Sequence, residues 1–357
     1  MRLVRRVIMV LSAVLLVGVV ALVLRTLDAL GLFTEVTHVA CEDRRFISGV
    51  EGAQDVRFDL ASNTLFIAAT DARAQLNHPS PHDGIYVWRP GQPAPPFKLD
   101  GTSADFHPSA LSLFRAADGS LTVMAVTQPA KGAPLVDIFD VTDPSTGKIA
   151  LHEREAIAGD MLINPDAIAA ADKSRFYVTN TQTSKTFFGR MLEIHLLLPR
   201  ANVIYFDGAN FRIVAEGLRV ASGIALSPDG SHVYVGEMTG RELRTYARDS
   251  FSGDLSLAGE LPVDSGLDNV SVEANGDLLI AGHPKLFDLL MYSRDSAKPS
   301  LSQILLAAVD RRGIPQAARA IYSGTDIGAA GVGVAVGERL LIGSGFSSKI
   351  LSCALPR

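Results

Sequence analysis

Five oxygen-bearing side chains recur at corresponding places along the chain, each ahead of an apolar segment with a turn: Gln54, Asp166, Ser222, Asp268 and Asn269. Small or apolar residues flank them, as in INPDAIA, VASGIAL and GLDNVSV. An all-oxygen set of this kind suits calcium, which accepts about six to eight oxygen ligands, and the carboxylates of Asp166 and Asp268 would balance the charge of the ion. Asp and Asn are also common turn residues, so the spacing leaves both a calcium site and ordinary turns open.

The elements that carry these side chains are predicted to be short strands. From residue 33 onward the sequence repeats one unit: a turn with Gly, Asn or Asp, an apolar strand, a polar connection and a second apolar strand. The clearest copies are Ser227–Tyr246, Glu273–Tyr292 and Val336–Cys353, and weaker copies begin near Ala61, Ala117 and Ala171. Six units at steps of roughly 46 to 62 residues predict an all-β fold, a six-bladed β-propeller over residues 31–357.

A propeller gathers residues from several blades at one end of its central channel. This fold would therefore bring the five oxygen-bearing side chains together. One helix is predicted within the propeller, over Met191–Leu198. This short apolar insertion either lies on a membrane surface or over the mouth of a pocket, or it is an ordinary packing helix.

Composition excludes several classes of protein. The 357 residues are 47% hydrophobic and 20% charged, which excludes a disordered chain. Lys and Arg total 33 against 38 acidic residues, and this slightly acidic balance argues against a nucleic-acid partner. The sequence has no Gly-x-Ser-x-Gly elbow, phosphate loop, dinucleotide fingerprint or paired-cysteine zinc motif, so an ordinary serine esterase is disfavoured.

The N-terminal residues 1–30 form a separate segment. Arg2, Arg5 and Arg6 precede an uncharged run, Val7–Leu24, that Arg25 closes. As a helix this run would span about 27 Å, close to the hydrocarbon thickness of a bilayer. The basic residues favour a cytoplasmic N-terminus, which predicts a membrane-anchored propeller on the extracytoplasmic side: periplasmic, lumenal or extracellular. A cleaved signal peptide is the alternative, although no A-x-A-like cleavage site follows the run.

Two cysteines, Cys41 and Cys353, lie near opposite ends of the exported part. A bond between them would close a loop of about 310 residues, worth about 5 kcal/mol by chain-entropy estimates. It would also join the first and last strands of a circular fold. Two free, buried thiols are the alternative. Two cysteines are too few for a disulfide scaffold or a thiolate zinc site.

Several stretches carry a resemblance to a known family. They are Val214–Glu237, Leu267–Pro284 and the closing LLIGSGFSSKILSCAL, with shorter matches at FHPSALSLF from Phe106 and FYVTN from Phe176. These stretches resemble the paraoxonase/arylesterase family, calcium-dependent six-bladed propellers that hydrolyse lactones and aryl esters and keep an uncleaved hydrophobic N-terminus. The chain looks like a divergent member. The two cysteines match the family disulfide, which favours the bonded pair.

The resemblance implies one catalytic calcium ion and casts doubt on a second, structural one. The family holds the first ion with a Glu, three Asn and an Asp, and the matching positions are Gln54, Asp166, Ser222, Asp268 and Asn269. Each replacement keeps an oxygen ligand, and exchanging Glu for Gln and Asn for Asp keeps the summed charge. The second ion would fall at Asp55 and Leu111, but Ala167 stands where the family has a further Asp, so we expect that site to be empty or absent.

The family's proposed general-base histidine pair falls on Ser109 and Gln128, neither of which takes a proton near neutral pH. His107 lies two residues before Ser109, on the same face of a strand. It would either reach the pocket or be a surface or core histidine, and the second reading is preferred. His283 matches a pocket-lining family histidine and is the better candidate.

The implied reaction is hydrolysis of a small lactone or aryl ester, with calcium supplying Lewis-acid stabilisation of the oxyanion. Water would be deprotonated by His283 or by a carboxylate, first Asp268 and then Asp166, or Asp268 would attack directly. Two alternatives remain: a strictosidine-synthase-like propeller with other chemistry, and a non-catalytic envelope propeller that binds a ligand.

Overall fold

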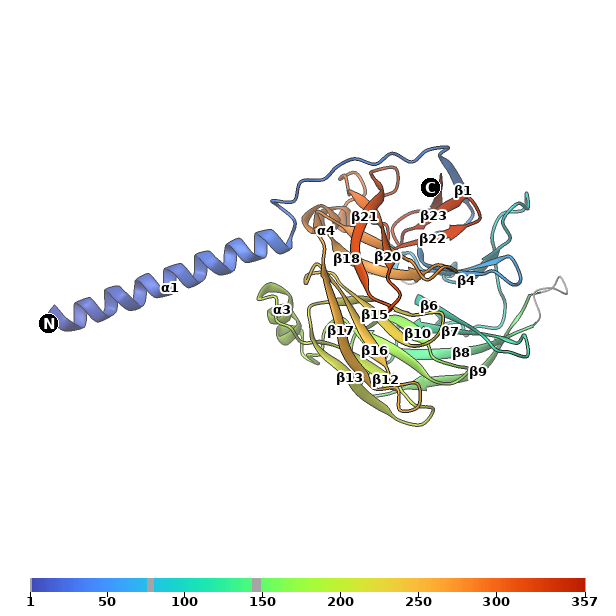
Figure 1. Cartoon of the computed structure of the whole chain (residues 1–357), viewed down its shortest axis with the longest axis horizontal. Coiled ribbons are helices and arrows are strands. Elements are labelled where there is room, and N and C mark those ends of the chain that lie inside the picture. Colours follow the sequence, from blue (N-terminus) through green and yellow to red (C-terminus); the bar gives the residue numbers. More distant parts are fainter. Residues whose placement is uncertain (1, 76–79, 143–148, 357) are drawn as a thin grey trace.

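Six four-stranded antiparallel sheets form a closed ring in this computed structural model, which describes residues 2–75, 80–142 and 149–356 (Figure 1). The first strand of each sheet contacts the first strands of the sheets before and after it, and the last of these contacts the first again. The six-bladed β-propeller predicted from the repeats is therefore confirmed.

Each blade extends outward from a strand that lines the central channel. The inner strands are β2 (Ala53–Asp59), β6 (Pro108–Arg115), β10 (Pro165–Ala170), β14 (Ala221–Leu226), β18 (Gly266–Val272) and β22 (Val332–Val336). The second strands are β3 (Thr64–Ala69), β7 (Leu121–Thr127), β11 (Phe176–Asn180), β15 (His232–Glu237), β19 (Leu278–His283) and β23 (Arg339–Gly343).

The third and outer strands complete each blade. The third strands are β4 (Gly84–Trp88), β8 (Leu135–Val141), β12 (Ala201–Phe206), β16 (Glu242–Arg248), β20 (Ser302–Val309) and β24 (Lys349–Ala354). The outer strands are β5 (Phe97–Lys98), β9 (Leu151–Ala158), β13 (Phe211–Leu218), β17 (Leu255–Pro262), β21 (Pro315–Gly324) and, in the sixth blade, β1 (Arg45–Ser48).

The six turns found in the sequence join inner and second strands, because each lies between the first two strands of a blade. The prediction of a second apolar strand is wrong for one unit. The second apolar segment of the unit Glu273–Tyr292 is helix α4 (Leu286–Arg294), and the third strand of that blade, β20, comes later. A short apolar run has no period that separates helix from strand.

Three short helices, α2 (Ala72–Gln75), α3 (Phe187–His195) and α4, lie in connections between second and third strands. These connections are all on the face where the inner strands begin. The helix predicted over Met191–Leu198 is α3, which begins earlier because the Thr186 side chain accepts a hydrogen bond from the Gly189 N–H and caps it. Phe187 and Phe188 on α3 are exposed.

The core lies between neighbouring blades. Each apolar cluster combines residues of two or more adjacent sheets, such as Tyr177 and Tyr205 of the third blade with Val233 and Val235 of the fourth. The rings of Tyr177 and Tyr205 lie 4.6 Å apart, and the Tyr177 hydroxyl donates to the Gly253 carbonyl. The aromatic pair stabilises the third blade beyond the area it buries, while the shared apolar cluster and the hydrogen bond to Gly253 hold that blade against the fourth.

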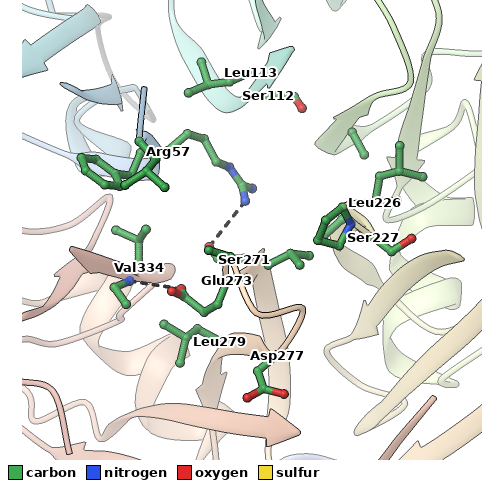
Figure 2. Close-up of a pocket in the computed structure, with 18 of the residues that line it drawn as sticks. Arg57, Ser112, Leu113, Leu226, Ser227, Ser271, Glu273, Asp277, Leu279 and Val334 are labelled. Carbon is green, nitrogen blue, oxygen red and sulfur yellow. Dashed lines mark hydrogen bonds between the residues drawn. The ribbon is translucent and has the colours of Figure 1, made fainter. Parts of the chain in front are cut away.

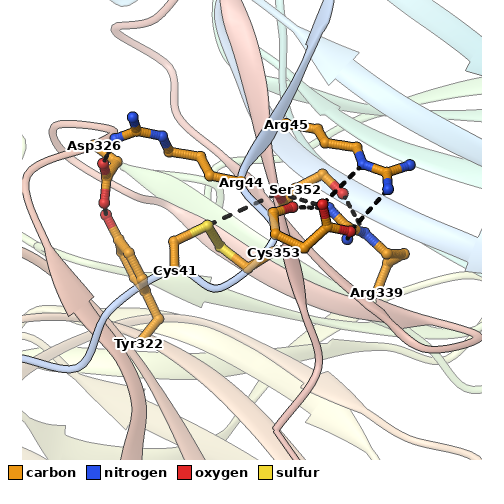
Figure 3. The surroundings of a disulfide bond; sticks show 9 residues. Cys41, Arg44, Arg45, Tyr322, Asp326, Arg339, Ser352 and Cys353 are labelled. Carbon is orange, nitrogen blue, oxygen red and sulfur yellow. Dashed lines mark hydrogen bonds and ion pairs between the residues drawn. A yellow bond between two sulfur atoms is a disulfide. The ribbon is translucent and has the colours of Figure 1, made fainter.

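The ring is closed by the N-terminal strand. Outer strand β1 pairs with β24, so the sixth blade is built from both ends of the propeller. The predicted Cys41–Cys353 disulfide is present beside this pairing (Figure 3). Arg339 of β23 adds hydrogen bonds to the Asp43 carbonyl at 2.7 Å and to the Ser352 carbonyl at 2.9 Å. Covalent and polar contacts thus fix the same seam.

Helix α1 (Arg2–Ala29) projects away from the propeller (Figure 1). Its segment Val4–Ala29 has a mean hydropathy of 3.2 and is not buried, so it is long and apolar enough to span a membrane or to be a signal sequence. Immediately after it, the Leu30 carbonyl accepts a hydrogen bond from the Phe287 N–H of α4. The helix therefore joins the propeller on the face where the inner strands begin.

Candidate metal centre and hydrolytic site

The five predicted oxygen ligands lie near the beginnings of the inner strands of four blades: β2, β10, β14 and β18. In each of these strands the register with the second strand shifts at the ligand position, and β6 has the same shift at Ser109. A β-bulge turns a side chain away from the regular alternation of the strand. The bulges therefore explain how polar side chains are presented at one end of the channel.

Close contacts link four members of this set. The Asn269 side-chain amide donates to the Gln54 carbonyl at 3.4 Å, across the channel from β18 to β2. The Asp268 carbonyl approaches Gly223 so closely that a Cβ there would lie 2.2 Å from it. The strand that carries Ser222 can approach Asp268 this closely because residue 223, next to Ser222, is a glycine without a Cβ. The predicted ligands from these three strands lie together.

Asp166 interacts with two other members of the set, Asp268 and Ser222. Burial and the negative charge of Asp268 raise the pKa of Asp166 to about 8. The charge of Asp55 acts in the same direction, while a hydrogen bond from Ser222 lowers the pKa. Neighbouring carboxylates oppose each other's ionisation unless a cation lies between them. A cation between Asp166 and Asp268 would therefore favour the ionised form of both carboxylates.

These residues fit a calcium ion. The Asn269 Oδ1 atom is buried and has no hydrogen-bond partner among the residues that the structure describes, and an unpaired buried acceptor is costly unless a ligand satisfies it. Within residues 2–75, 80–142 and 149–356, no three His, Cys, Asp or Glu side chains form a metal-binding group by themselves. The donors are instead two carboxylates, two amides and a hydroxyl, which is the hard-oxygen chemistry of calcium rather than that of zinc.

His283 borders this group. It is the last residue of β19 and is 1% exposed, and its Nε2 lies 3.0 Å from Asp268 Oδ2. Its Nδ1 is buried without a partner among the described residues. One ring nitrogen thus lies beside a carboxylate, while the other makes no hydrogen bond to the described residues.

His107 lies in a different environment. Its Nδ1 is 2.7 Å from Asp83 Oδ2 and its Nε2 is 3.0 Å from Asp105 Oδ1, so carboxylates occupy both ring nitrogens. The geometry favours the core reading over a base in the pocket. At the two positions of the family pair, the Gln128 amide donates to the Pro165 carbonyl at 3.3 Å, and the Ser109 hydroxyl is 3.5 Å from the Val126 carbonyl.

Asp55 and Leu111, the positions of the second ion, are already engaged. Asp55 is fully buried; its Oδ1 accepts from the Val56 N–H and its Oδ2 from the Leu111 N–H, both at 2.8 Å. The Arg57 guanidinium donates to Asp55 Oδ2 and to the Leu111 carbonyl, both at 3.1 Å. Arg57 was not predicted as a site residue, because a charged residue in a half-buried strand has the same pattern as a solvent-facing one.

An aromatic stack borders the site. The Arg73 guanidinium carbon lies 4.6 Å from the Tyr292 ring centre and 5.2 Å from that of Phe346. Phe346 follows Gly345, where a Cβ would lie 2.9 Å from Cδ of the Gln54 side chain. Phe346 therefore follows a residue that packs against Gln54, one of the candidate ligands.

The chain is similar to known proteins. The family model Arylesterase matches residues 99–355. Serum paraoxonase/arylesterase 1 of Rattus norvegicus is 28% identical over 295 residues, which cover 77% of this chain and 78% of that protein.

Solved structures show the same architecture. A gluconolactonase from Xanthomonas campestris superposes with a TM-score of 0.52 at 16% identity, covering 89% of this chain and 94% of that one. An aldose sugar dehydrogenase from Streptomyces coelicolor gives a TM-score of 0.53 at 12% identity, with 87% and 96% covered. At such identities the likeness establishes the fold alone.

Proposed function

The chain belongs to the arylesterase family and is an esterase/lactonase enzyme, and from this membership we propose that it is a calcium-dependent hydrolase of lactones and aryl esters. The observation that supports calcium binding is the set of inner-strand residues at β-bulges, which lie at one end of the channel. We propose that Gln54, Asp166, Ser222, Asp268 and Asn269 hold one ion there.

When bound, the ion would supply a positive charge to the substrate carbonyl oxygen, where negative charge develops during hydrolysis. The protein's own groups have three roles. His283, positioned beside Asp268, accepts the proton of the attacking water. Asp268 replaces it as base or attacks directly if His283 is dispensable. The Tyr292 and Phe346 rings exclude water from one side and bind the apolar part of the substrate.

Assay of the purified chain with aliphatic lactones and phenyl acetate tests this function. We expect hydrolysis of both, its loss with a calcium chelator, and its recovery when calcium is restored. Activity that is indifferent to the chelator would contradict the metal and favour a propeller with other chemistry. A lack of hydrolysis of every ester and lactone tested, with calcium bound, would contradict the substrate class.

We also propose that α1 is an uncleaved anchor with the propeller on the extracytoplasmic side. Arg5 and Arg6 flank its apolar run, and the Cys41–Cys353 bond suits an oxidising compartment. A reporter fused after residue 30 should be active outside the cytoplasmic membrane and remain in the membrane fraction. Release of a soluble reporter would show cleavage of the helix.

A further inference from the structure

The Arg57 side chain crosses the central channel and bonds three blades. From β2 it reaches the Leu111 carbonyl of β6 through Nε, at 3.1 Å. Through Nη1 it reaches the Val270 carbonyl of β18 at 2.9 Å and the Ser271 hydroxyl at 3.5 Å. The Arg57 side chain is 15% exposed, and the side chain of its carboxylate partner Asp55 is not exposed at all.

We propose that the Arg57 guanidinium is the built-in cation of this channel and takes the place of a second, structural calcium ion. Its partners are a carboxylate oxygen, two carbonyl oxygens and a hydroxyl, which are the donor types that calcium would use. The five fixed N–H donors of arginine satisfy such a set without a bound ion.

The charges of the channel support the replacement. Three carboxylates lie near the beginnings of the inner strands β2, β10 and β18: those of Asp55, Asp166 and Asp268. The arginine and one calcium ion in the site proposed at Gln54, Asp166, Ser222, Asp268 and Asn269 would balance these three negative charges. A second calcium ion would leave an excess of two positive charges in a poorly solvated place, which is unfavourable. This balance rests on the proposed function, in which one calcium ion binds at those five residues.

Arg57 also divides the channel along its length. Below it, on the side away from the metal centre, the channel widens into a cavity of about 1040 Å³ lined by later residues of the inner strands and by their turns (Figure 2). Figure 2 shows the guanidinium directed toward Ser271 at this cavity. The arginine therefore separates the metal centre from the lower cavity.

Arg57→Gln in the full chain, purified in detergent, tests the proposal. The variant removes the positive charge and frees the oxygens, so it should melt several degrees lower than the wild type at micromolar calcium. Millimolar calcium should restore much of this loss. After dialysis against the same millimolar calcium, the calcium content of the variant, measured by elemental analysis, should exceed that of the wild type by one ion per chain.

Arg154→Gln is the matched control, because Arg154 pairs with Asp140 at the surface of the second blade, away from the channel. Its smaller loss in melting temperature should not respond to calcium. Should Arg57→Gln fail to fold, Arg57→Lys keeps the charge with fewer donors, and it should melt at an intermediate temperature with the calcium content of the wild type.

The proposal is overturned if the wild type takes up a second calcium ion that stabilises it. It is also overturned if Arg57→Gln loses stability yet binds no additional calcium, since Arg57 would then be an ordinary structural bond. The absolute calcium content of the wild type reports the proposed five-residue calcium site. The difference in calcium content between Arg57→Gln and the wild type reports the replacement of an ion by Arg57. Failure of either proposal is therefore visible separately.

Discussion

Replacing Asp268 with alanine is expected to abolish calcium binding and to lower hydrolysis by at least about 10³-fold, toward the uncatalysed rate. The side chain supplies one of the two carboxylates proposed to offset the ion, and it also positions His283 at 3.0 Å. Calcium content by elemental analysis and turnover of phenyl acetate measure the two effects. No other single change removes both a ligand charge and the partner of the proposed base.

Two further variants make this expectation specific. Asp268→Asn keeps the size and one oxygen of the side chain, so it should weaken calcium affinity without changing the fold. Asp254→Ala, which removes a surface carboxylate paired with Arg212, should leave calcium content and activity unchanged. Because the charge of Asp268 raises the pKa of Asp166, its removal relieves a repulsion in the metal-free protein. Unchanged calcium content in Asp268→Ala would contradict the ligand assignment.

Much of the fold could be predicted from the sequence because its signals are local and repeated. The turn that joins inner and second strands is short and rich in Gly, Asn and Asp, and it recurs in every blade. The helix α4 could not be predicted, since its apolar residues suit a strand equally well. Its first turn is fixed by tertiary contact: the Phe287 N–H bonds the chain that follows α1.

The positions of the candidate ligands could be predicted, but their orientation could not. Regular alternation would turn consecutive residues such as Asp268 and Asn269 to opposite faces. The register shift between Leu267 and Val270 changes this alternation, and no sequence pattern marks a bulge of this kind. The partners of His107 could not be predicted either, because Asp83 lies 24 residues away in another blade.

The role of Arg57 depends on contacts between distant segments. Val270 and Ser271, which it reaches across the channel, are 213 and 214 residues away in sequence. The substitution of Ala167 for a carboxylate indicated only that a second calcium site is weakened. Which group compensates for the remaining charge of Asp55 depends on how the strands are arranged around one axis, and the spacing of residues along the chain does not determine that arrangement.

Replacing His283 with glutamine is expected to lower kcat by about 10²–10⁴-fold, the usual contribution of a general base. Glutamine retains an amide that can bond to Asp268, but it cannot take up a proton. Because His283 is not a proposed ligand, calcium content should remain that of the wild type. KM should change little, since the substituted group acts on the attacking water. Steady-state kinetics together with metal analysis separate these effects.

His107→Gln should give the opposite result. The substitution removes an imidazole held between two carboxylates and leaves the buried Asp83 side chain without that partner. The melting temperature should fall, while kcat per calcium-loaded, folded chain stays close to that of the wild type. If His283→Gln retains full activity, Asp268 becomes the base or nucleophile. If instead His107→Gln loses activity with its fold and calcium intact, the base is His107, and its two carboxylate contacts must open during turnover.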